Sequence, residues 1–85
     1  MVCITMKNLL HTNAVYLDSQ ALKMINYDED EHVLEATFNN NRTYHYKKVP
    51  QTIWSHFLNA IYRGASAGAF INKEIKPFYE CVEIT

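Results

Sequence analysis

The chain has 85 residues, enough for one domain with a small core, because a chain of this length hides only about 60 to 65 % of its unfolded surface. Hydrophobic residues make up 48 % of the sequence, which indicates a folded domain rather than a disordered segment. Eight Lys and Arg oppose nine Asp and Glu, and the formal net charge of -1 excludes the overall basic excess of a strong, salt-dependent nucleic-acid binder. Any such binding must depend on a local patch.

The sequence predicts a reduced, cytoplasmic chain. Cys3 and Cys81 lie near opposite ends, and neither has the spacing of a metal site. The two thiols would lie close together if both ends formed neighbouring strands, but a structural disulfide disagrees with a reducing compartment. No signal peptide is recognisable, no apolar run approaches the roughly 18 residues of a membrane span, and the four histidines are scattered. We therefore expect no membrane, metal or cofactor.

The first half of the chain predicts strands. A possible edge strand covers residues 2–6, and a strand over residues 22–27 carries apolar residues on both faces until the acidic run at 28–31 stops it. In that strand Leu22, Met24 and Asn26 are expected to share one face. Residues 32–38 alternate more cleanly and predict a half-buried strand.

A tight hairpin turn is expected at residues 39–41, three asparagines, because asparagine tolerates positive φ better than any residue except glycine. A strand over residues 42–48 follows. Its two faces carry Tyr44, Tyr46 and Lys48 on one side, and Thr43, His45 and Lys47 on the other. The connections are too short for crossovers, so these strands should form an antiparallel meander.

Two helices are predicted next. Pro50 suits the first turn of a helix, and Gly64 is a plausible end. The helix has one broad apolar stripe that must lie on the sheet, formed by Ile53, Trp54, Phe57, Leu58, Ile61 and Tyr62. Ser66 can cap a second, shorter helix, with Phe70, Ile71 and Ile75 pointing inward and Pro77 closing it.

Residues 78–85 alternate again and predict a last strand, which we expect beside the N-terminal one. The predicted fold is therefore a single α+β domain over residues 1–85. It consists of a small antiparallel β-meander of three or more strands, packed by one long and one short helix.

This order of elements resembles the KTSC domain, a module named from its place at the C-terminus of some lysyl-tRNA synthetases. The resemblance covers about residues 19–79, which leaves 1–18 as an N-terminal extension. It rests on Y-x-Y at Tyr44-His45-Tyr46, on Val49-Pro50, on the S-x-G-x-aromatic-apolar-N segment at 66–72, and on Ile75 and Tyr79. Asn41 stands where the family usually has glycine. RNA binding is the role that the resemblance implies.

The strand at 42–48 suits a single-stranded RNA surface, since rings stack on bases while cations hold phosphates. Tyr44 and Tyr46 would stack, and Arg42, Lys47 and Lys48 would hold the backbone. The alternative is that both rings pack beneath the long helix, against Trp54 and Phe57. In that arrangement Thr43, His45 and Lys47 occupy the open face.

A phosphate site is a second candidate, because Ser66-Ala67-Gly68 stands at a helix start where N–H groups and the helix dipole attract anions. Arg63 and Lys73 are near enough in sequence to assist. An ordinary capping turn accounts for the same residues.

We expect a non-enzymatic binding module, because Ser66, Cys3 and Cys81 each lack a recognisable base and orienting acid. The preferred partner is RNA or another nucleic acid, and the candidate contacts are Arg42, Tyr44, His45, Tyr46, Lys47, Lys48, Arg63 and Lys73, with Ser66 and Gly68 for an anion. One alternative is a regulator or inhibitor of a larger host complex, such as a phage or mobile-element protein, that binds a protein through a sheet edge. Another is a self-associating structural subunit.

Overall fold

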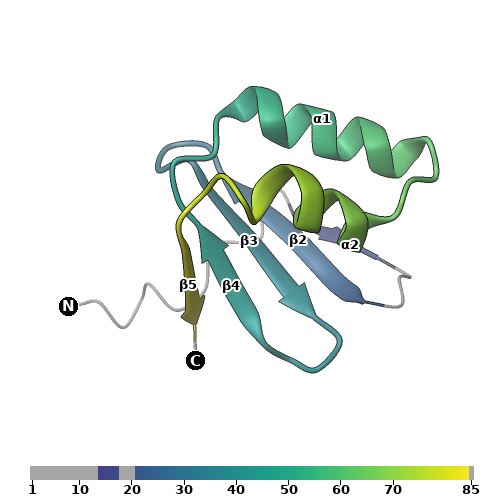
Figure 1. Cartoon of the computed structure of the whole chain (residues 1–85), viewed down its shortest axis with the longest axis horizontal. Helices are drawn as coiled ribbons and strands as arrows, with labels where there is room; N and C mark the ends of the chain where they lie inside the picture. The colour runs from purple at the N-terminus through teal and green to yellow at the C-terminus, as the bar shows by residue number, and fades with distance from the viewer. Residues whose placement is uncertain (1–13, 18–20, 85) are drawn as a thin grey trace.

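The computed structural model describes residues 14–17 and 21–84, so the expected strand at 2–6 and Cys3 lie outside the described residues. Five strands form one antiparallel sheet, and two helical segments lie together over one of its faces (Figure 1). The strands are β1 (Val15–Tyr16), β2 (Leu22–Asp28), β3 (Val33–Phe38), β4 (Thr43–Tyr46) and β5 (Cys81–Ile84). The helices are α1 (Gln51–Tyr62), α2 (Ala67–Phe70) and the π-helical η2 (Ile71–Ile75), which continues α2.

Every strand of this sheet pairs with its neighbour in the sequence, in the order β1-β2-β3-β4-β5. The predicted meander and the α+β class are therefore confirmed, and β1 and β5 extend the sheet on either side. The last strand is confirmed as β5, whereas its expected pairing with the N-terminal strand at 2–6 lies outside the described residues. In the described sheet β5 pairs with β4, where Cys81 lies opposite Tyr46, because the chain returns to β4 after the helices.

The predicted long helix is confirmed as α1, with Pro50 at its N-cap and Trp54 and Phe57 buried on its inner side. Gly64, with φ of 87°, follows its end. The apolar stripe is narrower than expected, because Tyr62 is 78 % exposed. Tyr62 lies five residues after Phe57, so at about 100° per residue it is rotated roughly 140° away from the buried side.

A β-bulge in β2 changes the faces that the sequence predicted. Leu22 lies opposite Phe38, but Met24 lies opposite Thr37, so the register shifts between these two positions. One extra residue in a strand moves the following side chains to the other face. Leu22 therefore packs in the core beneath the helices instead of sharing a face with Met24.

The second helix begins where Ser66 was expected to cap it: the Ser66 hydroxyl accepts a hydrogen bond from the Ala69 N–H at 3.2 Å. Phe70 stacks on Phe57 of α1, with ring centroids 4.6 Å apart. Ile71 and Ile75 are buried in the core that the helices and the sheet share, and the second helix lies on the same side of the sheet as α1 (Figure 1). No helix in the described residues has the length and apolar character needed to cross a membrane.

Candidate functional site

The tyrosines of the Y-x-Y segment lie on the face of the sheet that the helices cover. Tyr46 is 3 % exposed and belongs to the core, whereas Tyr44 is half-buried at its margin. Both rings therefore lie on the helix-covered face, but the tyrosine ring stacked on Trp54 is that of Tyr27, with centroids 5.3 Å apart. The expected stacking of a base on Tyr46 is excluded in this conformation because its ring is covered. Tyr44 keeps an accessible surface.

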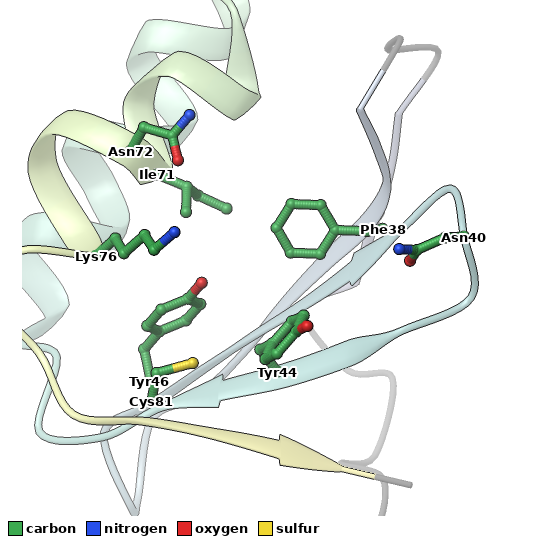
Figure 2. Close-up of a pocket in the computed structure, with 8 residues that line it drawn as sticks. All are labelled: Phe38, Asn40, Tyr44, Tyr46, Ile71, Asn72, Lys76 and Cys81. Atoms are coloured by element: carbon green, nitrogen blue, oxygen red, sulfur yellow. The ribbon is translucent and has the colours of Figure 1, made fainter.

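A cleft of about 280 Å³ separates this part of the sheet from the second helix (Figure 2). We refer to it as the cleft. Its lining residues come from β3, the β3–β4 turn, β4, the second helix and β5; they are Phe38, Asn40, Tyr44, Tyr46, Ile71, Asn72, Lys76 and Cys81. Two segments of the family resemblance, Y-x-Y and the end of S-x-G-x-aromatic-apolar-N, therefore meet at one hollow.

One end of the cleft is formed by two aromatic rings, and Arg42, which does not line the cleft, lies beside one of them. The rings of Phe38 and Tyr44 meet edge to face, with centroids 5.6 Å apart and planes at 84°. A hydrogen bond with the Tyr44 hydroxyl and the charge of Glu83 raise the pKa of Arg42. Arg42 Nε also lies 4.0 Å from Glu83 Oε2, so the guanidinium is held beside the Tyr44 ring.

The other end carries Lys76, Tyr46 and Cys81 (Figure 2). Burial raises the pKa of the Tyr46 hydroxyl and of the Cys81 thiol, although a hydrogen bond with Tyr46 and the charge of Lys76 act in the opposite direction on the thiol. Both groups therefore stay protonated at neutral pH. A protonated thiol is a poor nucleophile, so this geometry suits binding better than covalent chemistry.

The second face of the sheet, away from the helices, differs from the open polar surface expected around His45. Near its centre His45 is 8 % exposed, Glu35 1 % and Asn26 0 %. His45 and Glu35 lie directly opposite each other on β4 and β3, and their side chains are hydrogen-bonded at 2.9 Å. His45 is thus not available as a recognition residue in this conformation.

The remaining predicted cations are exposed but dispersed. Lys47 and Lys48 follow β4, and Lys48 lines a separate hollow with His32. Arg63 caps the C-terminus of α1, whereas Lys73 lies on η2 in another hollow, together with Ser66 and Glu74. These positions do not form one continuous basic patch.

Ser66 and Gly68 form an ordinary capping turn, the alternative to the phosphate site. The hydroxyl of Ser66 is occupied by the Ala69 N–H, and Glu74 lines the adjacent hollow, where its charge would repel an anion. Gly68 has a packing role, since a Cβ there would lie 3.3 Å from the Cβ of Ala21. The absence of a side chain at Gly68 lets the second helix approach the start of β2.

Six cleft residues were not among the predicted contacts, namely Phe38, Asn40, Ile71, Asn72, Lys76 and Cys81. The resemblance to the KTSC domain could have pointed to Asn72, because this residue ends the S-x-G-x-aromatic-apolar-N segment. Nothing in the sequence pattern favoured Lys76 over Lys73, since an α-helical spacing does not reveal a π turn.

Comparisons with known proteins agree with this fold. The family model of the KTSC domain matches residues 18–79. A protein of Tsukamurella paurometabola is 31 % identical over 68 residues, which cover 80 % of this chain and 96 % of that protein. The crystal structure of a KTSC domain protein from Yersinia pestis matches with a TM-score of 0.75 and 30 % identity, covering 86 % of this chain and 97 % of the other. The chain therefore belongs to the KTSC domain family.

Proposed function

We propose that this domain is a cytoplasmic, non-enzymatic module that binds single-stranded nucleic acid, preferably RNA, by taking one base into the cleft. The observation that carries the proposal is the half-buried ring of Tyr44 in the cleft, with Lys76 among the lining residues and Arg42 hydrogen-bonded to the Tyr44 hydroxyl. Stacking rings with cations beside them are what proteins use to hold bases and phosphates of single strands.

The dimensions favour a small ligand group. A volume of about 280 Å³ lies at the lower end of small-molecule pockets, which suits one base rather than a folded partner. The dispersed cations and the net charge of -1 argue against a long electrostatic track. Affinity should therefore be modest and should depend on this local contact.

Fluorescence anisotropy with a labelled 15-nucleotide single-stranded RNA in low salt tests the proposal. Tyr44→Ala should weaken binding about 5- to 150-fold, since a base stacked on an aromatic ring contributes about 1 to 3 kcal/mol. Tyr62→Ala is the matched control, because this ring is 78 % exposed on α1 and absent from the cleft. Absence of binding to any single strand, or equal losses in both variants, contradicts the proposal.

A second candidate function rests on β5. In the described sheet β5 pairs on one side only, with β4, and Val82 on this strand is 37 % exposed. An edge strand can accept an extended segment of another protein through its main-chain groups. The domain would then be a regulator or inhibitor of a larger complex, such as a phage protein acting on its host.

Affinity capture from a bacterial lysate, followed by mass spectrometry, separates these functions. The bait is compared with a Glu83→Pro variant, because the Glu83 N–H points away from β4 and its loss removes a donor from the free side of β5. A protein recovered by the wild type and lost with Glu83→Pro supports the edge. Recovery of nucleic acid alone removes this candidate.

A further inference from the structure

Lys76 reaches the cleft because of the π turn that precedes it. The Lys76 N–H donates to the Ile71 carbonyl oxygen at 2.8 Å, a hydrogen bond that spans five residues instead of the four of an α-helix. In an α-helix, a residue five positions after Ile71 would be rotated about 140° from it around the helix axis. The wider π turn brings Lys76 closer to the side on which Ile71 lies. Ile71 faces the sheet, so Lys76 leans over the cleft (Figure 2).

The ammonium group of Lys76 has no acidic partner within the described part of the chain. The ion pairs found there join Arg42 to Glu83 and His45 to Glu35. Beside Lys76, the Tyr46 hydroxyl and the Cys81 thiol are hydrogen-bonded to each other. The N–H donors of Lys76 are therefore available to a ligand.

The chemistry of these donors selects among bases. A lysine ammonium has three donors and no acceptor, whereas the Asn72 and Asn40 amides that also line the cleft can donate or accept. A base stacked beside Tyr44 would direct its edge toward the second helix. Uracil and guanine present a ring carbonyl acceptor where cytosine and adenine carry an amine donor.

We infer that the cleft prefers bases with this carbonyl, uracil and guanine, and that Lys76 is the specificity-determining residue. The inference rests on the proposed function, because it assigns a base class to the same site. Lys73, on the same helix but outside the cleft, has no part in the selection.

The test compares oligouridine with oligocytidine, 15 nucleotides each, because their bases differ in the carbonyl or amine at one ring position. Anisotropy titrations in the same low-salt buffer should give wild-type binding roughly fivefold or more tighter to oligouridine. Lys76→Met keeps most of the length of the side chain and removes its charge. It should remove most of this preference by weakening oligouridine binding, while Lys73→Met should preserve it.

Each outcome has one meaning. Equal wild-type affinities for the two oligonucleotides overturn the base preference but leave the proposed function standing. Equal losses for both oligonucleotides in Lys76→Met also overturn it, because they indicate a phosphate contact. No binding to either overturns the proposed function as well. Circular dichroism of both variants verifies that the fold is retained.

Discussion

The Glu35 Oε2 and His45 Nε2 atoms lie 2.9 Å apart across β3 and β4, on the face of the sheet away from the helices. The Glu35 side chain is 1 % exposed and that of His45 is 10 % exposed, so the pair is shielded from water. A buried polar pair is weak evidence for added stability, but removal of one partner leaves the other without its hydrogen bond. We therefore expect a structural role for His45.

His45→Ala should lower the free energy of unfolding by about 1 to 3 kcal/mol, because the Glu35 carboxylate loses this partner while staying buried. Urea denaturation followed by circular dichroism measures the change. His56→Ala, on the exposed side of α1, should stay within about 0.5 kcal/mol of the wild type. Equal stability of both variants would show that the pair contributes nothing. The folded His45→Ala protein should keep its RNA affinity.

The elements of the fold could be predicted because their signals are local. Asn41 illustrates this: its φ of 68° is the left-handed conformation expected of an asparagine turn between two alternating segments. The stripe around Trp54 and Phe57 likewise predicted the buried side of α1. The bulge between Leu22 and Met24 was not predicted, since a single inserted residue leaves no pattern of its own.

The site was less predictable than the fold. The sequence placed Tyr44 and Tyr46 on one face, but whether the helices covered that face depended on tertiary packing. Lys76 enters the cleft through a π turn, and its distance in sequence from Tyr44 conceals their proximity. Such a site depends on where separate elements meet, which periodicity does not encode.

Ser66→Ala distinguishes a helix cap from an anion site. Loss of the hydroxyl that accepts from the Ala69 N–H should lower the free energy of unfolding by about 1 kcal/mol. RNA affinity of the folded protein should not change, because Ser66 lies outside the cleft. Thermal denaturation and anisotropy measure the two effects. Ser66→Thr keeps the cap and is the control; a variant that loses RNA affinity without losing stability would restore the anion site.

Two buried phenols should make the fold sensitive to high pH. Burial raises the pKa of Tyr27 and of Tyr46, so the folded state holds these protons more tightly than the unfolded state. Their contribution to stability is complete below the unfolded pKa of about 10 and is lost as the pH rises from there toward the folded values. The free energy of unfolding should therefore begin to fall above about pH 9.5 and continue to fall as the pH rises further.

Urea denaturation at a series of pH values measures this fall. Tyr27→Phe or Tyr46→Phe removes one titrating hydroxyl, so each variant should show a shallower decline above pH 10. Tyr27→Phe should also lose about 1 kcal/mol at neutral pH, because the Tyr27 hydroxyl donates to the Val49 carbonyl oxygen. A decline as steep in both variants as in the wild type would assign the alkaline sensitivity to other groups.

The affinity for RNA should depend only weakly on the salt concentration. A single strand loses affinity with a log–log slope of about -0.7 for each phosphate that the protein neutralises, and one cleft can reach only one or two. We therefore expect a slope no steeper than about -2 between 25 and 200 mM NaCl. A slope near -4 would indicate an extended basic track that includes the dispersed Lys47 and Lys48.

Arg42 and Glu83 give this prediction a matched pair of variants. Their ion pair is exposed and 4.0 Å long, so it contributes little to stability and the guanidinium can exchange Glu83 for a phosphate. Glu83→Gln should tighten RNA binding, since it removes the negative charge that competes with a phosphate for Arg42. Arg42→Gln should weaken binding and reduce the salt slope by about 0.7. If both variants shift affinity in the same direction, Arg42 does not contact the phosphate backbone.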